Sequence, residues 1–562
     1  MSTSSHSNFS GSAPRDAAVP SVTGTDLAFA WPDGTAVFDG LTFALKGGRT
    51  GLIGRNGTGK STLLKLIAGE LTPESGTVRA CGDVGYLPQD VTLDTGLRVD
   101  QVLGIAEARA GLHAIETGDP GEEHFAAVGD DWDVEERARA TLDGLGLAHI
   151  GLDRTIGEVS GGECVLLRLA ALLLRRPQVL LLDEPTNSLD LSARHRLYAA
   201  VDAWHGVLVV VSHDRELLER VDQIADLYEG GLRLYGGNLS AYQEALATEQ
   251  AAAERMVRVA EADVQRQKRE LSEARAKLAA RKRYGNKMYA NKREPKVVMN
   301  ARKRTAQESA GKHRILHEQR LDAAREQLSQ AAEQVRDDER IRVDLPFTKV
   351  PPARQVLTVR DAVLRCGARA TFDVYGPERV ALVGANGAGK STLLRTIAGQ
   401  LAPAEGSVQA HVPLRMLPQR LDLLDASRSI VANVARFAPG AGENRIRAQL
   451  ARFLFRQGRA DQLVGTLSGG ELFRATLAAL MLAEPAPQLL LLDEPTNSLD
   501  LASVAQLTAA LESYEGALIV AGHDVPFLRT LGITRWLRLD GELSEVPPVE
   551  PAAPPGTPGS AR

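Results

Sequence analysis

Hydrophobic residues follow two different patterns along this chain. Strand-length apolar runs, such as those at 50–53, 180–182 and 207–211, occur in an N-terminal region and again in a C-terminal region, and helical segments accompany them. From 238 to 345, apolar residues instead recur at helical spacing. The pattern predicts an α/β chain in which a long α-helical segment joins two tandem domains.

The joining segment at 238–345 has the pattern of a coiled-coil hairpin. On its first arm, apolar residues recur every seven positions at Val257, Val264, Leu271 and Leu278. On its second arm they recur at Leu321, Leu328 and Val335. A spacing of seven is typical of the seam between two packed helices. Glycine and proline interrupt the pattern at 284–286 and 294–295, so the chain is expected to reverse near these residues.

The region of the expected reversal is strongly basic. Residues 281–304 contain ten Lys or Arg and one acid, which gives a formal charge of +9, whereas the whole chain carries −5. Basic side chains neutralise phosphates and aromatic side chains stack on bases, so this combination favours structured RNA as a partner. The alternative is a solvated helix face. The candidate RNA contacts are Lys287, Tyr289, Lys292, Arg293, Lys296 and Met299.

Composition narrows the class of protein. With 44% hydrophobic and 24% charged residues, the chain has an ordinary globular composition. Its three cysteines are far apart and lack metal-ligand spacing, which favours reduced thiols in the cytoplasm, and its apolar runs are too short to cross a bilayer. Residues 1–22 and 546–562 have the composition of disordered tails. The two α/β domains are therefore expected at 23–237 and 346–545.

The first domain contains a phosphate-binding loop. The sequence GRNGTGKS at 54–61 lies between a predicted strand at 50–53 and a predicted helix at 62–68, which is the context that such a loop requires. Its backbone amides can close around phosphates, Lys60 can reach the β and γ oxygens, and Ser61 can bind magnesium. The candidate nucleotide-binding residues here are Gly54, Asn56, Gly57, Gly59, Lys60, Ser61 and Thr62.

Two adjacent carboxylates follow the apolar strand at 180–182. Successive strand residues point to opposite sides, so Asp183 can bind magnesium while Glu184 polarises the attacking water. His213, after the strand at 207–211, is a candidate contact to the γ-phosphate, although a lone histidine is more often structural. The SGGE sequence at 160–163 is typical of a serine-capped helix start.

The same series recurs in the second domain. The repeated residues are Gly384, Asn386, Gly387, Gly389, Lys390, Ser391 and Thr392, then Gln419, then Ser468, Gly469 and Gly470, then Asp493 and Glu494, and then His523. Lys60 and Lys390 are 330 residues apart, whereas Glu184 and Glu494 are 310 apart. The first copy therefore has a net excess of twenty residues between its lysine and its glutamate, and the additional residues lie between Gln89 and Ser160.

Together these motifs resemble those of the ATP-binding cassette ATPases. The set comprises the two P-loops, Pro-Gln at 88–89 and 418–419, SGGE at 160–163 and 468–471, and LLLDEPTN followed by SLD and a histidine. Two cassettes joined by a basic helical linker resemble the ABC-F family, whose members are translation factors that act on ribosomes. The sequences at 303–311, 343–346 and 350–352 are similar to those of actinobacterial members that protect ribosomes from antibiotics.

The resemblance implies two composite sites for ATP and Mg²⁺ in a head-to-tail pair of cassettes within one monomer. Each site would combine one cassette's P-loop with Ser468, Gly469 and Gly470 or with Ser160, Gly161 and Gly162 of the other. The magnesium ligands would be Ser61, Gln89 and Asp183 in one site and Ser391, Gln419 and Asp493 in the other, with Glu184, Glu494, His213 and His523 as catalytic residues.

Some positions depart from the family pattern. Ser188 and Ser498 occupy positions where family members usually carry histidine. Trp31 matches the aromatic residue that stacks on adenine, whereas the second cassette has Arg-Cys-Gly at 365–367 and no aromatic ring in that region.

The resemblance implies a cytoplasmic, ATP-dependent ribosome-binding factor. Its linker would reach the large-subunit rRNA and the P-site tRNA near the peptidyl-transferase centre, and it would protect ribosomes from macrolides, lincosamides or streptogramins. One alternative is a housekeeping ABC-F factor that relieves stalled ribosomes. Another is the ATPase subunit of a drug-export transporter, although an exporter has no evident use for a basic coiled hairpin.

Overall fold

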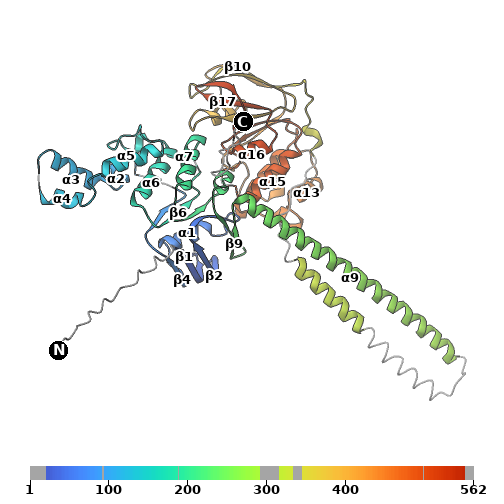
Figure 1. Ribbon diagram of the computed structural model, residues 1–562. Coiled ribbons are helices and arrows are strands. Elements are labelled where there is room, and N and C mark those ends of the chain that lie inside the picture. The colour runs from blue at the N-terminus through green and yellow to red at the C-terminus, as the bar shows by residue number, and fades with distance from the viewer. Residues whose placement is uncertain are drawn as a thin grey trace, which may run out of the picture. The chain divides into compact units, whose positions relative to one another are not determined.

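The computed structural model describes residues 21–90, 94–119, 121–187, 189–290, 315–332, 345–497 and 499–550. Two compact units result, one from Met1–Leu239 with Arg340–Arg562 and the other from Ser240–Glu339. The first unit contains two α/β domains, here called the first and second cassettes, and the second unit contains the long helix α9 (Figure 1). The predicted α/β class, with two tandem domains and a helical segment between them, is confirmed.

The first cassette has two sheets. One is antiparallel with strand order β2-β1-β4, and the other has the order β5-β6-β7-β3-β8-β9. The strands are β1 Ser21–Ala30, β2 Ala36–Lys46, β3 Gly48–Ile53, β4 Ser75–Ala80, β5 Val84–Leu87, β6 Val179–Asp183, β7 Val207–Val211, β8 Gln223–Tyr228 and β9 Gly231–Gly236. Every residue of β6 and β7 is buried, as expected for parallel strands covered on both faces.

The helices of the first cassette cover these strands and include an additional group. They are α1 Lys60–Ala68, α2 Val99–Val102, α3 Ala106–Glu116, α4 Glu122–Val128, α5 Val134–Gly144, the 3-10 turn η1 Ile156–Glu158, α6 Gly161–Arg175, α7 Leu191–Asp202 and α8 Arg215–Leu218. Helices α2 to α5 lie in the interval between Gln89 and Ser160, where the sequence places the additional residues of the first copy.

The second cassette repeats this plan in one nine-stranded sheet of order β13-β10-β11-β18-β17-β12-β16-β15-β14. Its strands are β10 Gln355–Val363, β11 Arg369–Tyr375, β12 Arg379–Val383, β13 Glu405–Ala410, β14 Leu414–Leu417, β15 Leu489–Asp493, β16 Ala517–Ala521, β17 Arg535–Asp540 and β18 Glu542–Val546. Its helices are α11 Lys390–Ile397, α12 Ile430–Phe437, α13 Glu443–Arg452, α14 Gly469–Met481, α15 Leu501–Glu512 and α16 Val525–Thr530, with 3-10 turns η2 Pro346–Thr348, η3 Gln457–Asp461 and η4 Val464–Thr466.

In both cassettes the parallel strands bring the motifs to one edge. The P-loop follows β3 in the first cassette, and Asp183 ends β6, which is separated from β3 by β7 alone. The second cassette has the same arrangement of β12, β16 and β15. Because parallel strands end at the same edge of a sheet, residues more than one hundred positions apart converge there.

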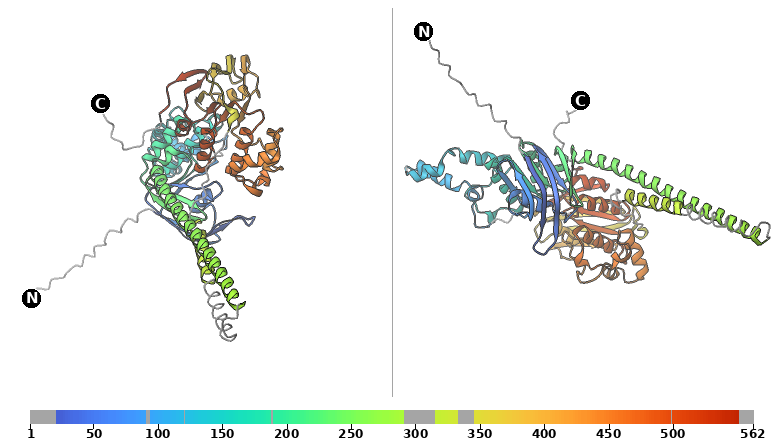
Figure 2. Two further views of the ribbon diagram at one scale, coloured as in Figure 1. Left: turned by 90° about the vertical axis from the view of Figure 1, so that its right-hand side faces the viewer. Right: turned by 90° about the horizontal axis from the view of Figure 1, so that it is seen from below.

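The second unit is a helical hairpin. Helix α9 spans Leu239–Ala290, and a second helical segment spans 315–332 beside it (Figures 1 and 2). Val264 and Leu271 pack against Leu321 and Ala324, with Leu328 partly buried against them. Arg275 pairs with Glu318 across the two arms at 3.1 Å. Four of the packed residues, Val264, Leu271, Leu321 and Leu328, belong to the predicted heptad seam, and Ala324 is an addition to it. Val257 and Leu278 are half-buried but lie outside this cluster, and Val335 lies outside the described residues.

The first arm is longer than the sequence predicts. The sequence predicts an interruption at 284–286, but α9 continues through Gly285 to Ala290. A single glycine within a helix costs only about 1 kcal/mol relative to alanine, which the surrounding 52-residue helix tolerates. Pro295, the other expected interruption, lies outside the described residues.

The domain boundaries expected near the two tails fall inside strands. Ser21 and Val22 belong to β1, where Val22 pairs with Leu45. Val546 ends β18 and pairs with Trp536, and the Val549 carbonyl accepts a hydrogen bond from Arg529 at 3.0 Å. Long-range strand pairing therefore orders residues whose local composition is that of a tail. Among the described helices, none combines the length and the apolarity needed to span a bilayer.

Candidate nucleotide-binding sites

The first P-loop has a backbone that only glycine fits. Gly54 has φ 155°, and a Cβ atom there would lie 2.6 Å from the Leu227 carbonyl oxygen. Gly59 has φ 96°, and its Cβ atom would lie 2.4 Å from Val37 Cγ1. The loop leads into α1, whose first residue is Lys60. Lys60 Nζ donates hydrogen bonds to the carbonyls of Gly54 at 2.8 Å and Arg55 at 3.0 Å.

The second P-loop has the same geometry. Gly384 has φ 152° and lies against the Leu539 carbonyl, and Gly389 has φ 101° and lies against Cys366 Sγ. Lys390 Nζ donates to the Gly384 carbonyl at 2.8 Å and lies 2.9 Å from His523 Nε2. Cys366 is thus the residue beside this loop, in the region where the sequence predicts no aromatic ring.

Each cassette also joins a hydroxyl and a carboxylate beside the P-loop. Ser61 Oγ donates to Asp183 Oδ1 at 3.0 Å, and Ser391 Oγ donates to Asp493 Oδ1 at 2.9 Å. Asp493 Oδ2 is buried and has no hydrogen-bond partner among the described residues. Hard oxygen ligands of this kind suit Mg²⁺. Gln89 and Gln419 each lie two residues after a neighbouring strand, β5 or β14, and are exposed.

The predicted catalytic residues lie next to each other. Glu184 Oε1 is 3.2 Å from His213 Nε2, and Glu494 Oε1 is 3.4 Å from His523 Nε2. Burial raises the pKa of both glutamates, whereas the neighbouring Lys60 and Lys390 lower it. Burial and Lys390 lower the pKa of His523 to about 3, and burial and Lys60 lower that of His213. Both imidazoles are therefore neutral near pH 7.

These residues surround a cavity of about 380 Å³ in the first cassette. Its lining residues are Trp31, Val37, Asn56, Gly57, Gly59, Lys60, Ser61, Thr62, Gln89, Glu184, Asn187, Val211 and His213. Trp31 is 38% exposed and packs edge-to-face on Phe29 at 5.3 Å between ring centroids. Sequence reasoning missed Val37, Asn187 and Val211. Asn187 could have been found, because Asn497 repeats it in the second cassette.

The SGGE serines cap helices. Ser160 caps α6 by accepting from the Glu163 amide, while Glu163 Oε2 accepts from the Ser160 amide at 2.9 Å. Ser468 and Glu471 form the same capping box on α14. Gly161, Gly162, Gly469 and Gly470 form the first turns of these two helices, so their amides lie at helix N-termini. The residues that line the first cavity all come from the first cassette.

The second cassette nevertheless contributes a residue beside the first P-loop. Asp500 Oδ2 accepts a hydrogen bond from the backbone amide of Asn56 at 3.0 Å, while its other oxygen caps α15 through Ser503. A residue of the first cassette likewise acts on the second P-loop. Burial lowers the pKa of Lys390, and the negative charge of Asp190 partly offsets this effect. Sequence reasoning missed both aspartates, although each is the last residue of a repeated SLD sequence.

One feature near the sites is asymmetric. Arg194, which is 8% exposed, donates to Asp214 Oδ2 at 3.1 Å, and Tyr198 Oη donates to the same oxygen at 2.7 Å. Asp214 follows His213 directly. The residue 310 positions after Arg194 is Val504, so the loop of His523 lacks an equivalent arginine from its own cassette.

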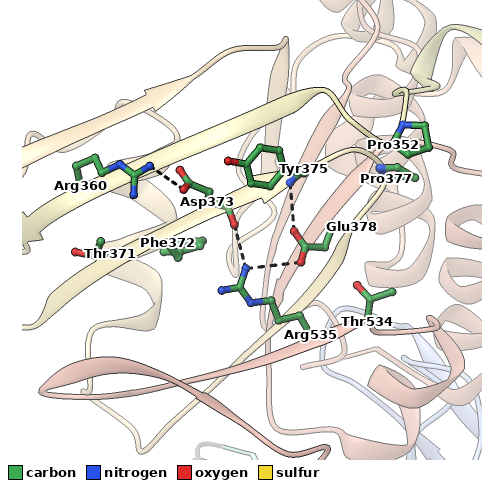
Figure 3. Close-up of a pocket in the computed structure, with 10 residues that line it drawn as sticks. All are labelled: Pro352, Arg360, Thr371, Phe372, Asp373, Tyr375, Pro377, Glu378, Thr534 and Arg535. Atoms are coloured by element: carbon green, nitrogen blue, oxygen red, sulfur yellow. Dashed lines mark hydrogen bonds and ion pairs between the residues drawn. The ribbon is translucent and has the colours of Figure 1, made fainter.

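A second cavity, of about 700 Å³, lies over β10, β11 and β17 and is separate from these residues (Figure 3). Arg360 pairs with Asp373 at 2.8 Å, and Arg535 pairs with Glu378 at 3.7 Å and donates to the Asp373 carbonyl at 3.0 Å. Because its charged groups pair with one another, this cavity offers no set of free phosphate-binding groups.

The predicted RNA contacts lie largely beyond the described residues. Lys287 is exposed on α9, and Tyr289 belongs to the same helix. Lys292, Arg293, Lys296 and Met299 lie outside the described residues, as do Ser188 and Ser498.

Comparisons with known proteins agree with the repeated geometry. A family model described as ABC transporter matches residues 38–187 and 368–497. The chain is 33% identical over 528 residues to the tylosin resistance ATP-binding protein TlrC of Streptomyces fradiae, covering 88% of this chain and 92% of that one. It is 31% identical over 509 residues to the probable ATP-binding protein YheS of Escherichia coli (strain K12), covering 86% and 73%. The solved structure of RNase-L Inhibitor shares the fold, with a TM-score of 0.54 and 20% identity over 89% and 86% of the two chains.

Proposed function

Because this chain belongs to the ABC-F family of ATP-binding cassette proteins and is an ATPase, we propose that it is a cytoplasmic translation factor that protects ribosomes from antibiotics. In this proposal it binds the large-subunit rRNA and the P-site tRNA near the peptidyl-transferase centre through the segment 238–345. The drugs concerned are macrolides, lincosamides or streptogramins, since the similar protein TlrC is named for resistance to tylosin.

ATP hydrolysis supplies the energy for the proposed action on the ribosome. Lys60 and Lys390 neutralise the β- and γ-phosphates of ATP, and the P-loop amides surround them. Ser61 and Asp183, with Gln89, would hold Mg²⁺, as would Ser391, Asp493 and Gln419. The ion would neutralise charge on the phosphates.

The buried glutamates orient the attacking water. Glu184 and Glu494 would accept a hydrogen bond from it in their ionised form. Burial raises the pKa of both carboxyls, and the neighbouring lysines partly offset this effect. His213 and His523, neutral at pH 7, can offer a ring N–H to the γ-phosphate. Each ATP also meets the helix N-terminus at Ser468–Gly470 or Ser160–Gly162 of the opposite cassette, so that the two cassettes close together.

The observation that carries the ribosomal role is the basic segment 281–304 within a helical hairpin that joins two complete cassettes. A formal charge of +9 in the segment that joins two helical arms suits a phosphate-rich partner. The described residues that line the first cavity all come from the first cassette. An exporter subunit would leave it unexplained.

Removing charge from this segment tests the proposal. Replacing Lys287, Lys292, Arg293 and Lys296 with Gln should weaken co-sedimentation with ribosomes and flatten its salt dependence, because fewer phosphates are neutralised. ATP binding should stay at the parental level. A matched control replaces four basic residues of the second cassette, Arg420, Arg428, Arg436 and Arg456. Parental ribosome binding and parental drug protection by the first variant would contradict the proposal, as would co-fractionation of the parent with membranes.

A further inference from the structure

Two large aromatic side chains lie exposed against each other in the additional helices of the first cassette. Phe125 on α4 is 44% exposed, and Trp132, between α4 and α5, is 52% exposed. Their ring centroids are 5.9 Å apart with the planes tilted by 56°. A single exposed aromatic residue is ordinary on a protein surface, but tryptophan and other aromatic anchors are enriched where partners bind.

The surface around this pair is acidic. Residues 110–136 contain nine Asp or Glu and neither Lys nor Arg, which gives a formal charge of −9. All of these acids except Glu135 are exposed. Asp131 and Asp133 pair with Arg137, and Asp119 lies beside His124. Glu122, Glu123 and Asp130 have no ion pair within the described residues, so negative charge remains around the two rings.

A buried arginine fixes this surface to the cassette. Arg109 on α3 pairs with Asp100 of α2 at 3.0 Å, with Glu135 of α5 at 2.5 Å and with Asp153 at 2.5 Å. Val128, Val134 and Ala138 are buried beneath the same helices. A surface held in this way loses little conformational freedom when it binds a partner.

The cassette fold does not require this acidity. In the second cassette, the corresponding interval 420–467 contains eight Arg and four Asp or Glu, a formal charge of +4, although it folds into α12 and α13 beside the equivalent strands. The negative charge therefore belongs to the first cassette's additional helices and not to the shared architecture.

We propose that the Phe125–Trp132 surface is a docking site for a lysine- and arginine-rich segment of a partner protein. The carboxylates attract the basic side chains, guanidinium or ammonium groups lie over the two rings, and the aliphatic parts of the partner cover the apolar surface. The same carboxylates repel nucleic-acid phosphates, so RNA is not the partner here. This surface acts separately from the basic segment 281–304, and the proposal stands without the ribosomal role.

Binding of a defined probe to the full-length chain tests the proposal. The probe is a fluorescein-labelled twelve-residue peptide of Lys, Arg and Leu, measured by fluorescence anisotropy at physiological salt. A second peptide with Glu in place of Lys and Arg, and a labelled single-stranded RNA, serve as comparisons. We expect the basic peptide to bind at this surface, whereas the RNA and the Glu peptide should bind only where the basic segment 281–304 attracts them.

Two sets of variants distinguish binding at the Phe125–Trp132 surface from attraction by acidic residues alone. Phe125→Ala with Trp132→Ala keeps the charge and should weaken peptide binding ~10-fold, the scale of a lost aromatic anchor. Glu122→Lys, Glu123→Lys and Asp130→Lys together should abolish it. The control carries Glu405→Lys, Asp422→Lys and Glu542→Lys, which makes the same charge change at exposed positions of the second cassette and should bind like the parent.

Four results would overturn the proposal. The first is parental binding by the alanine variant, since acidity alone would then explain the attraction. The second is equal loss in the control variant. The third is RNA binding that the alanine variant weakens, since the two rings would then serve RNA. The fourth is concentration-dependent self-association of the parent in sedimentation, lost when Lys287, Lys292, Arg293 and Lys296 become Gln, which would make a second copy of the chain the partner. Thermal unfolding and ATP turnover at parental values show that each variant is folded.

Discussion

Glu184 and Glu494 are both held in the left-handed backbone region, at φ 47°, which costs a residue with a side chain about 1–3 kcal/mol. Strand contacts maintain this conformation, because the Glu184 amide donates to the Val211 carbonyl at 2.8 Å and the Glu494 amide donates to the Ala521 carbonyl at 2.9 Å. At the scale of single residues, the backbone of β7 or β16 therefore positions each carboxylate beside its histidine.

Replacing both glutamates tests their role. Glu184→Gln with Glu494→Gln should lower ATP turnover by ~10²-fold or more, because the amide keeps the shape but cannot accept the water proton. Binding of a fluorescent ATP analogue should remain, since the P-loops are unchanged. Each single variant should keep part of the activity. Parental turnover by the double variant would remove these residues from the mechanism.

Individual elements are stabilised by contacts that differ in kind. The hairpin depends on an apolar seam that includes Leu271, which is 7% exposed, whereas Val259 on the same helix is 71% exposed. The additional helices of the first cassette depend instead on Arg109, which binds carboxylates from three other segments. The loss of stability caused by a substitution should therefore depend on pH in the additional helices but not in the hairpin seam.

Leu271→Ala should destabilise the hairpin by about 2–3 kcal/mol, because it removes buried methyl groups from the seam. Val259→Ala is the matched control and should change stability by less than about 0.5 kcal/mol. Circular dichroism during thermal unfolding, with limited proteolysis of α9, measures both. Equal behaviour of the two variants would mean that the arms do not pack through this seam in solution.

Arg109→Met should destabilise the first cassette by about 3 kcal/mol at pH 7, since three carboxylates lose a shared partner. The hydrogen bond that Arg109 donates to Glu135 lowers the pKa of the Glu135 carboxyl. The contribution of Arg109 to the free energy of unfolding is therefore fully present above the ordinary glutamate pKa, and it is lost as the pH falls through the lowered pKa. The difference between parent and variant should therefore shrink in acid. Denaturant unfolding at pH 7 and pH 3.5 tests this, with the exposed Arg139→Met as the control.

For the whole molecule, the contact between Asp500 and Asn56 joins residues 444 positions apart. It places a carboxylate of the second cassette beside the first P-loop, so residues of both cassettes lie at this loop. Arg194 makes the surroundings of the two histidines different, because it donates a hydrogen bond to Asp214 in the loop of His213. Its charge also partly offsets the rise in the pKa of Glu494 that burial causes. The surroundings of the two P-loops are therefore not equivalent.

Asp500→Ala should lower turnover at the first P-loop by ~10-fold, because a small displacement of phosphate-binding groups is costly. Glu494→Gln provides the background in which only the first site hydrolyses ATP. In that background Asp190→Ala, which affects the other P-loop, should have the smaller effect. If the two aspartate variants lose activity equally, the contact is not specific to its site.

The sequence by itself determined the two α/β domains, both P-loops, the paired carboxylates and histidines, and the heptad seam, because each depends on residue types at short, fixed spacings. It also located the additional residues of the first cassette, since the two copies could be compared. Tertiary structure decided the rest. The Asp500–Asn56 contact, the binding of Arg109 to three segments and the exposed pairing of Phe125 with Trp132 join residues through the packing of whole elements, which local spacing does not encode. Tertiary structure also decided two element ends. Helix α9 continues through Gly285 because a long helix outweighs the preference of a few residues. Val546 belongs to β18 because the neighbouring strand pairs with it.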